Sequence, residues 1–147
     1  LNDIVISRAG FSRLIGLDVY VNGSFLNAYE GDGIIISTPT GSTGYNLSAG
    51  GPIVDPMARL MIITPVCPHS LTSKSIVLPS DAKVSIEIAK KRKTQDTEAI
   101  VSFDGGNDFE LAAGDVLDIC VSQRTTQLVK ASDVNFYEIL RNKLGGK

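Results

Sequence analysis

Residues 31–53 read GDGIIISTPTGSTGYNLSAGGPI, and the rest of the chain is most easily understood outward from them. An acidic turn, Gly31-Asp32-Gly33, and a short apolar strand at 34–36 lead into a dense run of Ser, Thr and Gly. A hydrophobic core does not require so many small polar residues in one place. We therefore predict that the backbone passes close to a ligand here, with Gly41 and Gly44 permitting the close approach.

A helix is expected to start inside this run. Ser42 and Thr43 are residue types that cap helix N-termini, and the helix would continue through Ser48. A helix start offers free N–H groups and a partial positive charge, which suit the phosphate or ribose of a nucleotide. The run is not a P-loop and does not have the G-x-G-x-x-G spacing of dinucleotide-binding folds. A plain loop between a strand and a helix remains the alternative.

The composition is that of a globular domain. The chain has 147 residues, of which 43% are hydrophobic, and its mean hydropathy is +0.12. At this length a single domain over residues 1–147 is expected. The net charge of −2 gives no bulk attraction to nucleic acid or to an anionic membrane. Neither a signal peptide nor an apolar run of transmembrane length is recognisable, so a cytoplasmic protein is expected.

Cysteine and histidine usage and the first residues add three expectations. Cys67 and Cys120 both lie in apolar runs, which predicts buried free thiols, although a disulfide stays open. The single histidine and the scattered acids lack metal-ligand spacing. The chain starts at Leu1 without Met and reads as the middle of a longer sequence, so we expect it to be a C-terminal fragment.

Short strands separated by turns dominate the remaining sequence. Residues 15–21 alternate apolar and polar side chains, and Asn22-Gly23 is a strong hairpin signal before a return strand at 24–29. A turn is expected over 104–108. Further strands are predicted at 4–6, 60–66, 76–78, 84–88, 100–103, 109–111, 116–121 and 127–130.

The C-terminus predicts a helix. Phe136, Ile139, Leu140 and Leu144 have helical spacing, so an amphipathic helix is expected over 135–144, ended by Gly145-Gly146. The fold class is therefore mainly β and sandwich-like, with a short helix after the Ser/Thr/Gly-rich loop and a C-terminal helix. The basic run at 90–93 has no neighbouring aromatics to stack bases, so a solvated hairpin tip is preferred to a nucleic-acid site.

Taken whole, the string G-D-G-x-x-x-S-T-P-T-G-S-T-x-Y-x-x-S-A-G-G-P closely resembles the nucleotide-binding segment of bacterial NAD kinases. The resemblance also includes Asn2-Asp3, Pro68-His69-x-Leu71, the turn at Asp104-Gly105 and the F-x-x-x-L-x-x-K-L-G ending at 136–145. Two departures are visible. Ser73-Lys74-Ser75 stands where the family has Ser-x-Arg-Pro, and Gly106 replaces a family Gln.

The resemblance implies the C-terminal domain of an enzyme that transfers a phosphoryl group from ATP or polyphosphate to the adenosine 2′-hydroxyl of NAD. The product is NADP, and a divalent metal such as Mg²⁺ takes part. The family carries its catalytic Asp on a Gly-Gly-Asp-Gly loop of an N-terminal domain, and no such loop occurs in this sequence. No catalytic residue is therefore predicted here, and the isolated chain is expected to be inactive without that domain.

The resemblance also assigns binding roles. Asn2, Asp3 and the 43–48 segment would hold the adenosine half, with Tyr45 stacking or hydrogen bonding. Asp32 would accept a hydrogen bond from the nicotinamide carboxamide, within one subunit or across an interface. His69 would lie near the nicotinamide, with a packing role as the alternative, and Arg13 would contact the nucleotide or be simply solvated. The complete predicted set is Asn2, Asp3, Arg13, Asp32, Thr40, Ser42, Thr43, Gly44, Tyr45, Asn46, Ser48 and His69.

The expected partners follow from the same resemblance. They are NAD, the N-terminal domain and further copies of the chain in a homodimer or homotetramer, with no nucleic acid and no membrane. Three alternatives stay open: a non-catalytic nucleotide-binding or oligomerisation module, a β-sandwich assembly domain, and the C-terminal domain of a related lipid kinase. The last should not share the S-T-P-T-G-S-T string.

Overall fold

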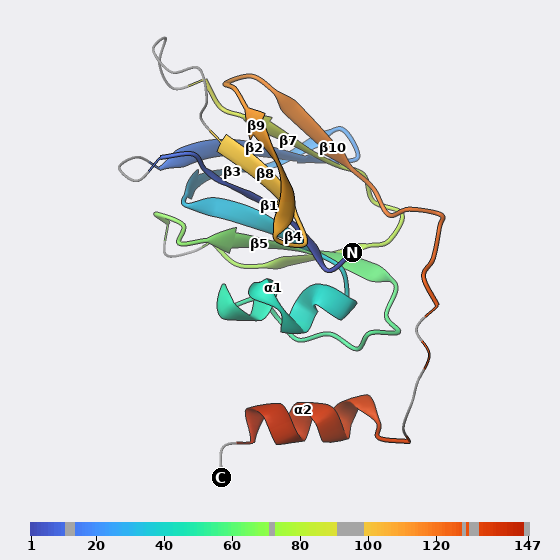
Figure 1. The fold of residues 1–147 in the computed structure, drawn as a ribbon. Coiled ribbons are helices and arrows are strands. Elements are labelled where there is room, and N and C mark those ends of the chain that lie inside the picture. Colours follow the sequence, from blue (N-terminus) through green and yellow to red (C-terminus); the bar gives the residue numbers. More distant parts are fainter. Residues whose placement is uncertain (11–13, 71–72, 91–98, 128, 130–132, 146–147) are drawn as a thin grey trace.

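Two antiparallel sheets make up the body of the protein (Figure 1). The computed structural model describes residues 1–10, 14–70, 73–90, 99–127, 129 and 133–145. The larger sheet has the order β6 (Ile76–Pro79), β5 (Leu60–Val66), β4 (Gly33–Ser37), β1 (Asp3–Arg8), β8 (Ala99–Phe103) and β9 (Gly106–Leu111). The smaller sheet has the order β10 (Val116–Ile119), β7 (Val84–Ile88), β2 (Ile15–Val21) and β3 (Ser24–Gly31). The predicted mainly β, sandwich-like class is confirmed.

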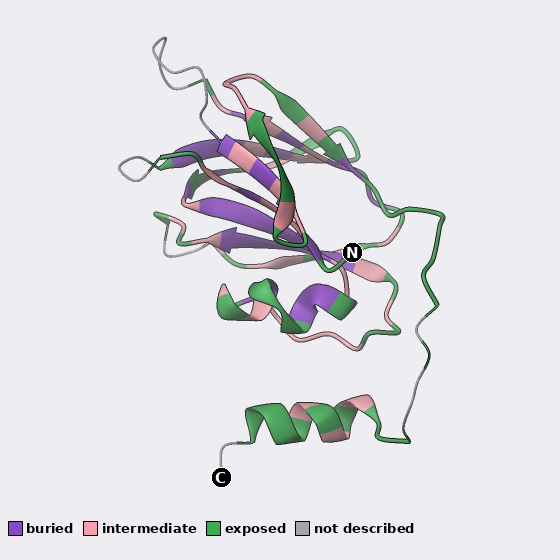
Figure 2. Cartoon of the chain, viewed as in Figure 1, coloured by how far each residue is buried: buried purple, intermediate pink, exposed green. Residues whose placement is uncertain are grey.

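The hydrophobic core contains residues from both sheets (Figure 2). The alternation predicted for β2 and β7 buries every second residue, because successive side chains on a strand point to opposite faces. The core residues are Ile6, Ile15, Leu17, Val19, Tyr29, Ile34, Ile36, Met61, Ile63, Val84, Ile86, Ile88, Ala99, Val101 and Ile119.

Strand β4 is buried on both faces, as its unbroken apolar run predicts. Ile34 and Ile36 belong to the sandwich core, whereas Ile35 alternates to the opposite face and is also buried. The 3₁₀ turn η1 (Thr40–Thr43) and the short helix α1 (Tyr45–Ser48) follow β4 and contact it (Figure 1). The Ser/Thr/Gly-rich loop is therefore anchored beside the strand that precedes it.

The hairpin between β2 and β3 forms at Asn22-Gly23. Asn22 and Gly23 have φ of 50° and 79°, so both residues occupy the left-handed region that a two-residue hairpin turn requires. The Asn22 side chain also accepts a hydrogen bond from the backbone N–H of Lys83 at 2.9 Å. The turn thus ties β3 to the loop before β7.

Several predicted elements in the second half of the chain differ from those in the structure. Only Asp104 and Gly105 form the turn between β8 and β9, because β9 already starts at Gly106. Strand β10 ends at Ile119 rather than at 121. Gln127 and Val129 lie in no strand, while residues 128 and 130 and most of the basic loop at 91–98 lie outside the described residues.

Cys67 and Cys120 are free thiols, as predicted, but the prediction that they are buried is wrong, since both are exposed. Each follows directly after a strand, β5 and β10 respectively, where the alternation that buries a side chain has ended. Cys67 has a φ of 44°, which takes the backbone out of the extended conformation of the strand.

Helix α2 (Phe136–Leu144) confirms the predicted C-terminal helix. Asn135 caps it: its side chain accepts from Glu138 N–H at 2.9 Å, and Glu138 accepts from Asn135 N–H at 3.2 Å. None of its residues is buried, and Figure 1 shows it apart from the sheets. Tyr137 Oη donates to Asp55 Oδ2 at 2.9 Å, and this bond to a carboxylate raises the pKa of Tyr137. No helix in the described part is long and apolar enough to cross a membrane.

Candidate functional site

The loop after β4 folds differently from the helix predicted to start at Ser42 or Thr43. Gly44 is the N-cap residue of α1, and no side chain caps that helix. Ser42 Oγ is instead bonded to Val54, accepting from its N–H at 3.1 Å and donating to its carbonyl at 3.2 Å. The Ser42 hydroxyl, predicted to cap a helix, thus ties the loop to Val54 in the segment that follows α1.

Asn46 completes this internal support. Its Nδ2 donates to the Ser42 carbonyl at 2.9 Å and to the Pro52 carbonyl at 3.0 Å. Its Oδ1 accepts from Thr64 Oγ1 on β5 at 2.7 Å. Gly51 is required beside it, because a Cβ there would overlap the Asn46 side chain.

Two of the predicted contact residues have their side chains inside the loop. Ser42 and Asn46 are both 0% exposed. Their polar atoms instead hold the loop in shape, as buried polar groups must find partners inside the protein. Thr40, Thr43, Gly44, Tyr45 and Ser48 carry the exposed surface of the same segment.

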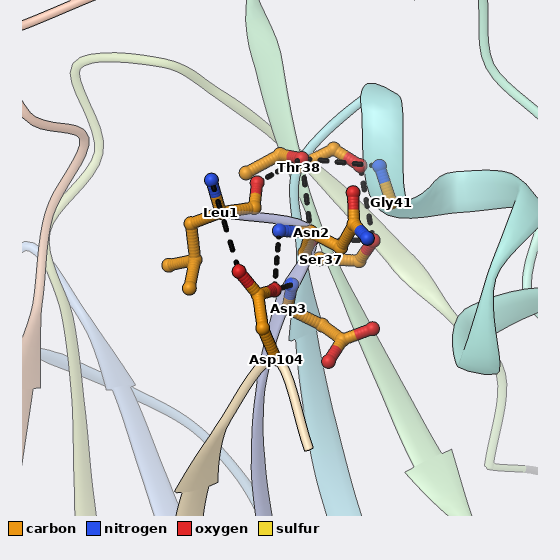
Figure 3. A network of polar contacts seen from close by, with 7 residues as sticks. All are labelled: Leu1, Asn2, Asp3, Ser37, Thr38, Gly41 and Asp104. Atoms are coloured by element: carbon orange, nitrogen blue, oxygen red, sulfur yellow. Dashed lines mark hydrogen bonds and ion pairs between the residues drawn. The ribbon is translucent and has the colours of Figure 1, made fainter. Parts of the chain in front are cut away.

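The start of β1 lies directly against this loop (Figure 3). The Asn2 carbonyl accepts hydrogen bonds from Thr38 N–H at 2.9 Å and from Thr38 Oγ1 at 3.2 Å. A Cβ at Gly41 would overlap that carbonyl, so only glycine allows the loop to approach so closely. Antiparallel pairing of Asp3 with Ser37 sets the register that brings the two motifs together.

Asp3 is buried at this junction, with 7% of its surface exposed. Burial, and secondly the negative charge of Asp104, raise the pKa of the Asp3 carboxyl. Its Oδ2 lies 4.0 Å from the position that a Cβ on Gly44 would occupy. Figure 3 shows the Asp3 carboxylate pointing away from Asp104. The Asp3 carboxylate therefore lies beside Gly44, which directly precedes Tyr45.

A cleft of about 390 Å³ opens beside β1 and β4. Tyr45 and Asp32 both line it, as the sequence predicts for residues of one site. Arg8 Nε lies 2.8 Å from Asp32 Oδ1, and Arg8 Nη1 donates to the Gly10 carbonyl at 2.7 Å. The cleft is lined by Val5, Ile6, Ser7, Arg8, Ala9, Gly10, Asp32, Gly33, Tyr45, Val66 and Cys67.

A second hollow of about 550 Å³ lies where Asn2, Thr38 and Thr40 meet the segment that leaves β10. Ile4, Ile36, Met61 and Ile119 form its apolar part, and Arg124 contributes a positive charge. Asn2 and Thr40 therefore face a different hollow from Asp32 and Tyr45. The segment at 2–10 contributes to both hollows. Asn2 and Ile4 line the 550 Å³ hollow, and residues 5–10 line the 390 Å³ cleft.

The remaining predicted residues lie elsewhere. His69 is exposed on the loop after β5, where its N–H donates to the Glu30 carbonyl at 2.7 Å, and it does not line the 390 Å³ cleft. Thr43 lines neither hollow. Arg13 lies outside the described residues. Within the described part of the chain, no three His, Cys, Asp or Glu side chains gather as a metal-ligand set.

Two residues in this region carry no role in the sequence prediction. Arg8 is not among the predicted site residues, yet it forms a half-buried ion pair with Asp32. Asp104 is read as a turn residue, yet its carboxylate reaches the start of β1. An Asp-Gly turn signals a hairpin, but nothing local indicates which distant backbone its side chain will meet.

Several known proteins are similar in sequence to this chain. The sequence model of the ATP-NAD kinase C-terminal domain matches residues 1–131. The NAD kinase of Lachnoclostridium phytofermentans is 52% identical over 147 residues, which are 100% of this chain and 52% of that protein. The NAD kinase of Agathobacter rectalis is 52% identical over 145 residues, covering 99% of this chain and 51% of that protein. The chain thus spans about half the length of these curated relatives.

Solved structures show the same fold. Yeast NADH kinase, complexed with NADH, superposes with a TM-score of 0.71 at 36% identity, over 80% of this chain and 34% of that one. An NAD kinase from Archaeoglobus fulgidus, in complex with ATP, gives a TM-score of 0.73 at 30% identity, over 84% of this chain and 45% of that one. The resemblance carried by the 31–52 string is therefore confirmed. The chain belongs to the ATP-NAD kinase C-terminal domain family.

Proposed function

We propose that this chain is the nucleotide-binding half of an enzyme that phosphorylates the adenosine 2′-hydroxyl of NAD to give NADP. The observation that carries the proposal is the junction of Asn2 and Asp3 with the loop at 38–48, next to the cleft that Asp32 and Tyr45 share. Relatives of similar sequence are NAD kinases, and one similar structure holds NADH and another ATP.

The exposed side of the junction suits the adenosine half of the dinucleotide. Tyr45 is 48% exposed and offers an aromatic face for stacking. The buried Asp3 carboxylate beside Gly44 would accept hydrogen bonds from ribose hydroxyls, and Asn2 would add its side-chain amide. Thr40, Thr43 and Ser48 are exposed hydroxyls on the same segment and would complete the polar contacts.

Asp32 suits the carboxamide of the nicotinamide. Arg8 holds Asp32 Oδ1, and Asp32 Oδ2 would then accept from a donor in the cleft. The same ion pair would weaken if the carboxylate turned, so Arg8 acts as a positioning residue for Asp32. His69 and Arg13 remain proposed contacts, and either would have to reach the ligand from outside the 390 Å³ cleft or from a second copy of the chain.

Catalysis in this scheme depends on positioning. The chain would hold the 2′-hydroxyl in place, while the other half of the enzyme supplies the aspartate that accepts its proton and the phosphoryl donor, ATP or polyphosphate. A Mg²⁺ ion would neutralise charge on the donor phosphates. The described residues bring no group of three metal-ligating side chains together, so the metal would be held chiefly by phosphate oxygens and by that other half. The chain alone should therefore bind NAD without turning it over.

Two wider proposals accompany this function. We propose a cytoplasmic enzyme, because both cysteines are free and exposed, a condition that a reducing compartment preserves. We also propose that copies of the chain associate, since the edge strands β3 and β9 expose Phe25 and Phe109, each at 59%. Light scattering after size-exclusion chromatography would test the second proposal.

The binding function can be tested by NMR titration of the 147-residue chain with NAD, NADH and ATP. NAD should shift the amide signals of Asp3, Gly44 and Tyr45, and Tyr45→Ala should weaken that binding about tenfold through the loss of a stacking surface. Tyr137→Ala, which removes an exposed aromatic on α2 that lines neither hollow, is the control. Shifts confined to other surfaces, or none with any nucleotide at millimolar concentration, would refute the proposal.

A further inference from the structure

The turn between β8 and β9 reaches the start of β1, 102 residues away along the chain. Asp104 Oδ1 accepts hydrogen bonds from the N–H of Asn2 at 2.6 Å and from the N–H of Asp3 at 3.2 Å. The backbone closes the contact, since Asp104 N–H donates to the Asp3 carbonyl at 3.2 Å. One carboxylate thus holds two successive amides of the segment assigned to the nucleotide.

The opposite side of the same segment is held by the binding loop (Figure 3). There the Asn2 carbonyl accepts from Thr38, and Gly41 packs against it. Asn2 is therefore clamped between Asp104 on its amide side and the loop on its carbonyl side. With the backbone fixed from both directions, the Asn2 and Asp3 side chains take no part in the clamp and stay free for a ligand.

We propose that Asp104 is a positioning residue for nucleotide binding, holding the Asn2–Asp3 backbone in the geometry that presents both side chains to the ribose. The inference deepens the proposed function and rests on it. Asp104 makes no contact with the ligand in this scheme. It acts through Asn2 and Asp3, and through the shared clamp it sets the distance between them and the loop.

Pairing of the strands in the larger sheet does not require an acid at position 104. Strand β1 already pairs with β8 from Ile4 to Arg8, and the pairing with β4 covers its other edge. The Asp104 charge also opposes ionisation of the nearby Asp3, although Asp104 Oδ2 lies 4.0 Å from the ammonium of Leu1. That repulsion makes the Asp3 carboxylate a more basic hydrogen-bond acceptor, which favours a ribose hydroxyl as its partner.

The backbone of Asp104 allows a well-matched pair of variants. Its φ of 52° lies in the left-handed region, which Asn and Gly both tolerate. Asp104→Asn retains one carbonyl acceptor for the two amides, whereas Asp104→Gly removes it without straining the turn. Asn107→Gly is the control: Asn107 lies in the same hairpin with a φ of 54°.

NMR titration of the 147-residue chain with NAD tests the proposal. Asp104→Gly should weaken NAD binding about tenfold, whereas Asp104→Asn should stay within about threefold of the unchanged chain. Asn107→Gly should bind as the unchanged chain does. Equal binding by all variants, or equal losses in the Asn and Gly variants, would overturn the positioning role.

A ligand-free measurement separates this proposal from the proposed function. Carbon NMR of the Asp3 carboxyl should show a lower pKa in both Asp104 variants, and amide exchange at Asn2 and Asp3 should accelerate in Asp104→Gly alone. An Asp104 carboxylate that does not contact the start of β1 in solution would change neither. If the unchanged chain fails to bind NAD, the proposed function fails. If these two local readouts do not move, the clamp fails whatever the chain binds.

Discussion

The Ser/Thr/Gly-rich loop, with the segment that follows it to residue 54, and helix α2 both lie outside the sandwich, yet they are held in different ways. The loop contains only a 3₁₀ turn and one four-residue helix, which would not be stable alone. Buried bonds from Ser42 and Asn46 and the contact with Asn2 fix it. Helix α2 has a complete capping box, but none of its residues is buried. Local signals therefore decide whether a helix forms, whereas buried polar partners decide where a segment is placed.

Gly41→Ala should produce the largest effect, because it attacks the contact that places the loop. A Cβ at Gly41 would overlap the Asn2 carbonyl, and this clash is with backbone that cannot rotate away. The free energy of unfolding should fall by about 3 kcal/mol or more, measured by urea denaturation. Gly106→Ala is the matched control, because the space around Gly106 is open. Equal stability of the two variants would show that the loop approaches β1 less closely than described.

Asn46→Ala should have the next largest effect on the free energy of unfolding. It leaves the Ser42 and Pro52 carbonyls without the amide that donates to them, while the Thr64 hydroxyl loses Asn46 and keeps Ser75 Oγ at 2.9 Å. Unfolding free energy should fall by about 2–3 kcal/mol, since unpaired buried polar groups carry a desolvation penalty. Asn27→Ala, an exposed asparagine on β3, should change it by less than about 0.5 kcal/mol. A small effect at Asn46 would mean that water replaces the lost contacts.

Asn135→Ala provides a contrast with Asn46→Ala, because Asn135 acts only on the helix that it caps. Loss of the cap should destabilise α2 by about 1 kcal/mol, visible as reduced helicity in the NMR chemical shifts of Tyr137 to Leu140. The unfolding midpoint of the sandwich should not change, because α2 buries nothing against it. If the midpoint fell as far as for Asn46→Ala, α2 would be an integral part of the domain.

The same contrast explains which parts of the structure were predictable. Alternation and turn chemistry act between near neighbours, so β5 spans the predicted 60–66 and the Asn22-Gly23 hairpin forms as expected. The capping box of α2 is equally local. Its apolar spacing indicates a buried face, however, and the described part of the chain supplies no covering surface. Periodicity establishes the helix but not its partner.

The candidate site was predictable in composition and less so in the direction of its side chains. The 31–52 string identifies the loop, and Asp32 and Tyr45 do share a cleft. The side chains of Ser42 and Asn46 turn inward because their hydrogen-bond partners lie on the inner side of the loop. These partners, Val54, Pro52 and Thr64, are distant along the chain or belong to no motif that marks them as partners. The Arg8–Asp32 ion pair and the reach of Asp104 depend on strand order in the same way.

Asp3→Asn should have the smallest effect on stability and the opposite sign. The pKa of Asp3 is raised above 3.8 by burial and then by Asp104, so the folded chain binds this proton more tightly than the unfolded chain does. The stability that the protonated acid contributes below pH 3.8 is therefore lost as the pH rises through its folded-state pKa. The melting temperature of the variant should exceed that of the unchanged chain at neutral pH, and the difference should vanish in acid.

The double variant with Asp104→Asn should gain less than the sum of the two single changes, because each change removes the same repulsion. NAD binding should weaken in Asp3→Asn even as the domain becomes more stable, since an amide cannot replace the basic carboxylate as an acceptor for ribose hydroxyls. A variant that is less stable at neutral pH would show that Asp3 is retained for the fold. A stabilised variant that binds NAD poorly would show that this acid is kept at the junction for its ligand, at a cost to stability.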